Sequence, residues 1–326
     1  MELIHADSDL VELQLLTEFD VYEAVSGLGY KYADNDFELQ IPESIWTTEP
    51  IENGHRLYQL GNEWGGRVEN IEHAGTTVKC SGPTWRGMIA RKIITPPAGQ
   101  AYKTITAMEA NQAIAALLGT SFGNLFTVST ANSGITVSGS FRYANMLGAL
   151  HSMLQQYGAR LDIVFNGTQV ELSAQSSVDY MDVELSQDYE APLESSVAYG
   201  EAYNHVIALG RGELTAREVV ELWRLDDGTV TSTPQANDET DKQFVLDYPN
   251  AESVEELINN ATAKLLENNP VESIKINLDE IDTDLKLGDV VGGADYVTGL
   301  RISKPITQKI FKADNKGKTI NYKAGE

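Results

Sequence analysis

The sequence predicts a mixed, mainly β protein in which two β-barrel-like parts flank a small α+β part. Short runs that alternate apolar and polar residues, separated by turn residues, fill residues 1–98 and return after residue 178. Between them, residues 99–177 contain two apolar stripes with helical spacing and a strong hairpin signal. Because 326 residues exceed the usual size of one domain, we expect three domains, at residues 1–98, 99–177 and 178–326.

The first part is expected to consist of short strands. The clearest is residues 37–41, where apolar and polar side chains alternate until Pro42 ends the run. The other expected strands lie at residues 10–16, 20–25, 57–60, 66–72 and 76–80. A barrel would use the tryptophans of this part in its core or rim, whereas a sugar-binding surface would expose them. We expect core or rim positions for Trp46, Trp64 and Trp85.

The second part is expected to combine two helices with a hairpin. Residues 106–109 have the spacing of a capping box, and the apolar stripe that follows predicts a helix ending at Gly119. A second helix is expected at about residues 143–157, and its histidine, His151, at a boundary or on the surface. Residues 161–173 predict a hairpin that turns at the Asn166–Gly167 pair.

The third part begins with strands and continues into a helix. The expected strands lie at residues 204–209, 219–225 and 229–233. Residues 234–242 are polar and lack periodicity, which predicts a surface loop. Ser253 and Glu256 then form a capping box, and an apolar stripe predicts a helix near residues 253–268.

The C-terminal segment is expected to form an antiparallel meander that closes a small barrel. Its strand signals lie at residues 273–278, 285–291, 300–310 and 319–323. The Gly288–Asp289 pair can supply a turn or bulge within the second of these runs. Pro305 lacks a backbone donor, which indicates a sheet edge or a bulge at that position.

The charge of the chain argues against nucleic-acid and membrane partners. Acidic residues outnumber basic residues 48 to 24, which gives a formal net charge of −24. Nucleic-acid affinity comes largely from Lys and Arg, so specific binding of nucleic acid is not expected. Residues 110–141 carry no charge, but they contain too many polar and turn residues to span a bilayer. The N-terminus shows no signal peptide, and we expect synthesis in a cytoplasm.

The sequence shows no pattern of catalytic or cofactor-binding residues. Cys80 is the only cysteine and is expected as a buried side chain, which excludes an intrachain disulfide. The five histidines stand far apart in the sequence and form no zinc-binding motif; they are His5, His55, His73, His151 and His205. A nucleophile elbow and a phosphate-binding loop are also missing. We therefore expect no enzyme activity, no cofactor and no metal.

One acidic cluster could hold Ca²⁺ through hard oxygen ligands. It consists of Asp279, Glu280, Asp282, Asp284 and Asp289. The cluster lacks the residue order of an EF-hand, and we expect a solvated acidic loop between two strands instead. A carboxylate pair for glycoside hydrolysis stays open, because acids are abundant and their spacing is set in three dimensions.

Three segments resemble a known protein family. They are "GPTWRGMIARKIITPP" at residues 82–97, "FRYANMLGALHSMLQQYGARLDIVF" at residues 141–165, and the C-terminal run of Leu-Gly-Asp-Val-Val, "TGLRISKPITQKIFK" and "KTINYKAGE". In their order and spacing they resemble the tail hub, or tail-tip, proteins of phages with long non-contractile tails. The resemblance covers nearly the whole chain.

The resemblance implies a structural role without catalysis. It implies a homotrimer of two-barrel subunits, which forms a pseudo-hexameric ring at the tail tip of the virion. Such a hub links the end of the tail tube to the receptor-binding apparatus and surrounds a channel for DNA exit. The implied partners are other copies of the chain, the distal tail protein ring, the tape-measure protein, and receptor-binding or tail-fibre proteins.

Two other functions compete with the structural one. A cell-wall hydrolase or peptidase of the tail tip would need a further domain, and the chain ends at Glu326, just after the last expected strand. A carbohydrate-binding module would use the tryptophans of the first part. The sequence does not indicate which residues form the oligomer and partner interfaces.

Overall fold

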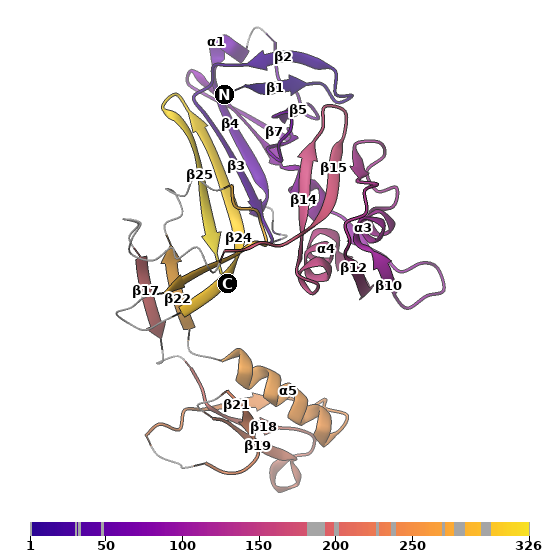
Figure 1. The fold of residues 1–326 in the computed structure, drawn as a ribbon. Helices are drawn as coiled ribbons and strands as arrows, with labels where there is room; N and C mark the ends of the chain where they lie inside the picture. The colour runs from indigo at the N-terminus through magenta and orange to yellow at the C-terminus, as the bar shows by residue number, and fades with distance from the viewer. Residues whose placement is uncertain are drawn as a thin grey trace. The chain divides into compact units, whose positions relative to one another are not determined.

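The computed structural model describes residues 2–29, 31, 34–46, 49–180, 193–198, 202–225, 228–235, 239–268, 271–276, 284–294 and 301–325. Strands dominate, and the mainly β fold class with an α+β part is confirmed (Figure 1). Contacts divide the chain into two compact units. The first unit contains Met1–Leu193 and Ile276–Glu326, and the second contains Glu194–Lys275. The three domain boundaries expected from the sequence stay a prediction.

The largest sheet of the first unit contains strands from both ends of the chain (Figure 1). Its strand order is β16-β23-β24-β3-β4-β8-β7, and β25 pairs with β24. The bounds are β3 (Val21–Gly27), β4 (Asp36–Pro42), β7 (Asn70–Ala74), β8 (Thr77–Pro83), β16 (Asp179–Tyr180), β23 (Val290–Ala294), β24 (Arg301–Asp314) and β25 (Gly317–Ala324). The expected meander thus exists as β23, β24 and β25, and it continues onto β3 through an antiparallel pairing.

Pro305 lies in this meander, at the place where the pairing changes. It is paired with Val290 of β23, and the register between β24 and β25 shifts between Ile306 and Gln308. Pairing of β24 with β3 begins only at Gln308. The expected bulge therefore lies beside the proline, where a backbone donor is missing.

A second sheet of the first unit shares a hydrophobic core with the largest sheet. Its order is β2-β1-β5-β6, with β1 (Leu3–Ala6), β2 (Glu12–Leu16), β5 (Arg56–Tyr58) and β6 (Gly65–Arg67). Leu3, Leu39, Trp64 and Phe311 belong to the shared core, so strands from distant parts of the sequence bury one another. Gly82 has to be glycine here, because a Cβ would collide with the carbonyl oxygen of Arg67.

Two short helices complete this region, α1 (Glu43–Trp46) and α2 (Trp85–Ala90). The Thr84 side chain caps α2 by accepting a hydrogen bond from the Gly87 backbone. Trp64 and Trp85 are buried, and Trp46 packs against the core. The predicted core or rim use of the tryptophans is confirmed.

The α+β part packs two helices on a three-stranded sheet of order β11-β15-β14 (Figure 1). Its elements are β9 (Ile93–Ile94), β10 (Lys103–Glu109), α3 (Ala110–Leu118), β11 (Phe126–Val128), β12 (Thr136–Phe141), β13 (Ala144–Asn145), α4 (Met146–Gln155), β14 (Ala159–Phe165) and β15 (Val170–Ser176). The hairpin predicted around Asn166 and Gly167 is confirmed, because β14 and β15 pair along their whole length. The capping box predicted at residues 106–109 is wrong: these residues end β10, and Glu109 alone caps α3.

The second unit has its own core between a four-stranded sheet and a helix. The sheet order is β20-β19-β18-β21, and β17 and β22 form a separate pair. The bounds are β17 (Leu193–Ala198), β18 (His205–Leu209), a 3₁₀ turn η2 (Leu214–Ala216), β19 (Val219–Arg224), β20 (Val230–Thr231), β21 (Gln243–Asp247), α5 (Val254–Glu267) and β22 (Val271–Ile276). The predicted cap of α5 is confirmed, since Ser253 accepts from the Glu256 backbone.

Two details of the second unit differ from the sequence-based expectation. The strand expected at residues 273–278 is β22, and it pairs with β17 instead of joining the C-terminal meander. Sequence alternation identifies a strand but not its partner. β21 was not expected; it runs parallel to β18 and completes the sheet. In the described part of the chain, no helix is long and apolar enough to cross a membrane.

Candidate functional site

The fold brings together two histidines that lie fifty residues apart in the sequence. β1 and β5 pair, and the Nε2 atom of His5 lies 2.8 Å from the Nδ1 atom of His55. The pKa of His5 is lowered to about 4, mainly by burial and also by the neighbouring His55, while Asp7 opposes the shift. The two histidines stand far apart in the sequence, and the pairing of β1 with β5 brings them together.

Two of the remaining nucleophile and base candidates, His151 and Cys80, are held in packed surroundings. His151 is buried on α4 against Arg86, so the expected boundary or surface position is wrong. Burial lowers its pKa well below the usual value, and the Arg86 charge adds to this effect. Cys80 is buried as predicted, and burial raises the pKa of its thiol to about 12. A thiol with that pKa supplies almost no thiolate near neutral pH.

The acidic cluster is only partly described, since residues 279, 280 and 282 lie outside the described residues. Asp284 lies 2.5 Å from Lys286 and 3.4 Å from Lys309. Asp289 is buried and pairs with Arg160 at 2.7 Å, so the expectation of a solvated loop is wrong for this residue. Among the residues that the structure describes, no group of three or more His, Cys, Asp and Glu side chains could hold a metal ion.

A buried ionic cluster joins three distant segments of the first unit. Glu63 lies in the turn between β5 and β6, Arg86 on α2 and Lys309 on β24. The Glu63 carboxylate is 3.0 Å from the Lys309 ammonium and 3.4 Å from Arg86 Nε. Lys309 is 2 % exposed and also lies 5.3 Å from the centre of the Trp64 ring. The two cations offset the cost of burying Glu63.

The protonation of Glu63 follows from this arrangement. Burial raises the pKa of the Glu63 carboxyl, but the charges of Lys309 and Arg86 outweigh burial and hold the pKa below its ordinary value. Arg86 also donates a hydrogen bond of 2.7 Å from Nη2 to the Leu161 carbonyl of β14. The cluster therefore connects the two sheets of the barrel-like region with the α+β part.

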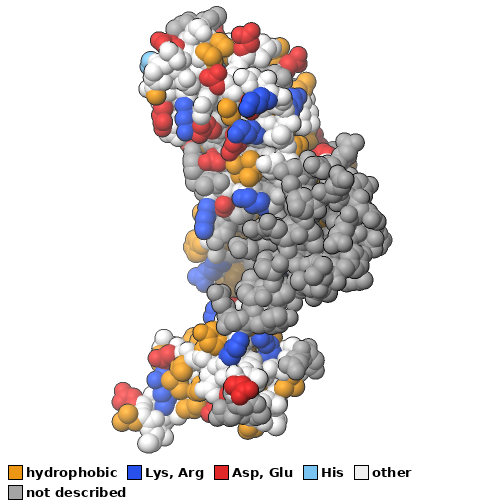
Figure 2. All heavy atoms as spheres, turned by 90° about the vertical axis from the view of Figure 1, so that its left-hand side faces the viewer, with side chains coloured by type: hydrophobic (Ala, Val, Ile, Leu, Met, Phe, Trp, Pro, Cys, Tyr) orange, Lys and Arg blue, Asp and Glu red, His pale blue; other side chains and the backbone are white. Residues whose placement is uncertain are grey.

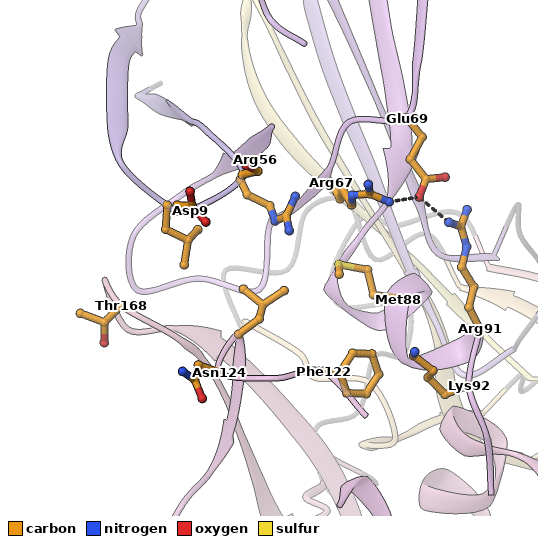
Figure 3. A pocket seen from close by; sticks show the side chains of 13 residues that line it. Asp9, Arg56, Arg67, Glu69, Met88, Arg91, Lys92, Phe122, Asn124 and Thr168 are labelled. Carbon is orange, nitrogen blue, oxygen red and sulfur yellow. Dashed lines mark hydrogen bonds and ion pairs between the residues drawn. The ribbon is translucent and has the colours of Figure 1, made fainter. Parts of the chain in front are cut away.

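One cavity of the first unit is a basic pocket (Figure 3). It has a volume of about 820 Å³. Four basic and two acidic side chains line it together with apolar and small polar ones. The lining residues that define the basic pocket are Ser8, Asp9, Leu10, Arg56, Arg67, Glu69, Met88, Arg91, Lys92, Phe122, Asn124, Leu125 and Thr168.

The charges of the basic pocket are only partly balanced. The Glu69 carboxylate accepts from Arg67 at 3.1 Å and from Arg91 at 2.6 Å, as the dashed lines in Figure 3 mark. Among the residues that the structure describes, no carboxylate forms an ion pair with Arg56 or Lys92. Burial lowers the pKa of the Arg56 guanidinium, and the positive charge of Arg67 lowers it further, whereas Asp9 opposes the shift. The site thus carries local positive charge in an acidic chain.

The basic pocket cannot be recognised in the sequence. Its basic residues come from β5, from β6 and from the end of α2, and no spacing in the sequence links them. Arg91 and Lys92 fall within the segment "GPTWRGMIARKIITPP", which is the only hint in the sequence. On the face drawn in Figure 2, basic and acidic side chains are interspersed. The four basic side chains of the basic pocket are therefore brought together only by the tertiary structure.

The fold is similar to that of several solved proteins. No family model matches the chain, and no curated protein matches it. The 43 kDa tail protein of prophage MuSo2 from Shewanella oneidensis aligns with a TM-score of 0.57 at 12% identity, covering 100% of this chain and 98% of that one.

Two further tail proteins align over the same length. The prophage tail protein gp18 from Listeria monocytogenes has a TM-score of 0.53 at 12% identity, covering 100% of this chain and 95% of the other. The tail protein from Neisseria meningitidis has a TM-score of 0.52 at 11% identity, with coverage of 100% and 96%. At these identities the likeness concerns the fold. The chain has the fold of phage tail proteins.

Proposed function

We propose that the protein is a structural component of a phage tail, the central hub of the tail tip. One observation carries the proposal. Three solved tail proteins align with the whole of this chain, and the chain in turn covers at least 95% of each of them. A shared architecture over the whole length supports a shared structural role better than likeness of one domain would.

The proposed assembly is a homotrimer in the virion of a phage with a long non-contractile tail. Three copies related by rotation bury heterologous interfaces and close into a ring. In this arrangement the hub contacts the distal tail protein ring and the tape-measure protein on one side, and receptor-binding or tail-fibre proteins on the other. Its channel lets DNA leave during ejection, and it binds no nucleic acid specifically.

The proposed role needs no catalytic centre. The buried ionic cluster is fully engaged in pairing between segments of the chain, and the raised pKa of Cys80 disfavours a thiolate nucleophile. A cell-wall hydrolase would instead lyse cell walls in a zymogram. Clearing by the purified full chain, lost on substitution of a single described carboxylate with its fold retained, would replace the structural proposal with an enzymatic one.

The proposal is tested by imaging the assembled particle. Cryo-electron microscopy of virions should show density for this chain at the tail tip with three-fold symmetry. Light scattering of the purified chain should give three times the mass of 35.7 kDa. Density for the chain elsewhere in the particle, or any other symmetry at the tip, would contradict the hub role.

A further inference from the structure

We propose that the basic pocket is a contact site between copies of this chain, where it holds a carboxylate-bearing segment of the neighbouring copy. The inference rests on the proposed function in one respect, namely that several copies assemble. It adds the surface through which they do so and the chemistry of the contact.

The charge of the basic pocket favours an anionic occupant. Arg56 and Lys92 face the cavity without an ion-pair partner among the described residues, while Glu69 is shared by Arg67 and Arg91 (Figure 3). Arg56 and Lys92 therefore leave positive charge at the cavity wall. A second carboxylate would complete the pairing, because guanidinium groups bind carboxylates through directed N–H donors.

The apolar lining restricts which anion fits. Leu10, Met88, Phe122 and Leu125 line the cavity beside the cations. The Lys92 ammonium lies 5.4 Å from the centre of the Phe122 ring, so charge and apolar surface are adjacent. An inorganic ion would leave this surface exposed, whereas a peptide segment with an acidic and an apolar side chain would cover both. The cavity of about 820 Å³ has room for several side chains.

The walls of the basic pocket are fixed by bonds that do not depend on an occupant. Phe165 of β14 and the β5–β6 turn exchange two backbone hydrogen bonds of 2.9 Å, through Gly61 and Asn62. The Tyr58 and Phe165 rings pack with centroids 4.1 Å apart. The wall from the α+β part is thus tied to the wall from the smaller sheet. A preformed site loses little conformational entropy on binding.

The composition of the chain identifies a second copy as the occupant. With a net charge of −24, the surface of every copy is rich in carboxylates, so the basic pocket is complementary to the chain that carries it. The same net charge repels a DNA backbone, which makes phosphate groups of DNA a poor fit. Association through this site should therefore weaken as salt screens the charges.

The test compares charge variants of the full chain. Lys92 is exposed at the rim, so Lys92→Glu should fold, and its melting temperature is measured to show this. Lys92→Arg keeps the charge. Lys316→Glu is the control: it changes the net charge by the same amount as Lys92→Glu, but in the exposed turn between β24 and β25. Association constants come from analytical ultracentrifugation, with salt varied from about 0.05 M to about 0.5 M. Arg56→Gln provides a second, independent change in the basic pocket.

We expect Lys92→Glu and Arg56→Gln to weaken association by about tenfold or more, while Lys92→Arg and Lys316→Glu associate as the unaltered chain does. Equal weakening in Lys92→Glu and Lys316→Glu would overturn the inference, as would a chain that stays monomeric at every concentration. A monomer whose melting temperature rises with citrate or inorganic phosphate would mark the basic pocket as a small-anion site and also overturn it.

The outcomes separate this inference from the proposed function. If imaging finds the chain at the tail tip and the basic-pocket variants assemble normally, the inference fails and the hub role stands. If association depends on the basic pocket but no particle contains the chain, the inference stands and the hub role fails.

Discussion

At the scale of single residues, the protein places charge and titratable groups inside its first unit. Glu63, Arg86 and Lys309 meet in a region where Lys309 is 2 % exposed. His5 is fully buried and contacts His55. Such groups stabilise the fold only with all partners present, because an unpaired buried charge carries a large desolvation cost.

Glu63→Gln is expected to destabilise the protein strongly. The substitution removes the counter-charge that Lys309 and Arg86 share, and it leaves Lys309 only the exposed Asp284 at 3.4 Å. Breaking a buried ion pair on one side costs about 3–5 kcal/mol. Urea unfolding should show this as a lower midpoint. The control is Glu43→Gln, which removes only an exposed contact with His73 and should cost under about 1 kcal/mol. Equal losses of stability in both variants would show that the buried ionic cluster contributes little to the free energy of unfolding.

His5 is expected to make stability depend on pH. Its pKa is about 4 in the folded protein against an ordinary value of 6.5, so the unfolded chain binds a proton first as the pH falls. The free energy of unfolding should therefore decrease from pH 6.5 to about pH 4. In His5→Gln the urea midpoint should change less across this window. His73→Gln, at an exposed position, should keep the full dependence.

At the scale of elements, the start of α3 is held by a residue that also belongs to a strand. β10 runs directly into α3, and Glu109 is the last residue of the strand and the cap of the helix. Its carboxylate accepts from the Gln112 backbone at 3.0 Å and from the Ser133 backbone at 2.9 Å. One side chain therefore begins the helix and also holds the loop before β12.

Glu109→Gln should test this cap. Burial raises the pKa of Glu109, but hydrogen bonds from Ser133 and the Gln112 backbone outweigh burial and lower the pKa to about 2. Losing the charged cap should cost about 1 kcal/mol at neutral pH. The difference from the unaltered chain should disappear as the pH falls from 4.5 to about 2, because the folded carboxyl then protonates. Glu18→Gln, in an exposed loop, should show neither effect.

At the scale of the whole molecule, the net charge has a consequence for the proposed ring. A ring that DNA passes through would retain the DNA on a basic wall, because Lys and Arg bind phosphate groups with counterion release. The excess of 24 acidic over basic residues per chain favours a wall of Asp, Glu and uncharged polar side chains. Basic groups would then lie at contacts between copies or on the outside, as we propose for the basic pocket. A surface kept acidic only for solubility is the competing explanation.

For the proposed ring we therefore predict a negative or neutral channel. Substituting acidic wall residues by lysine should slow DNA ejection, and high salt should restore the rate by screening the added charges. Ejection is followed by the fluorescence of a DNA dye after receptor addition. The control places the same number of lysines on the outer surface. A strongly positive channel in the assembled ring, or equal rates at low and high salt, would contradict the prediction.

The sequence alone determined the elements whose signals are local. The alternation at residues 37–41, the hairpin around Asn166 and Gly167, and the Ser253 cap of α5 all lie within windows of a few residues, and the structure confirms each. The mainly β fold class followed from such elements. The capping box predicted at residues 106–109 was wrong, because these residues are the end of β10, which pairs with β12.

Only the tertiary structure decided what requires distant residues to meet. The pairing of β24 with β3, the Glu63–Lys309 ion pair and the basic pocket all join segments that no sequence spacing links. The same holds for β22, whose alternation predicted a strand but whose partner is β17. The physical reason is that periodicity reports which face of an element is apolar, whereas the choice of partner and the sharing of charges depend on how whole elements pack against one another.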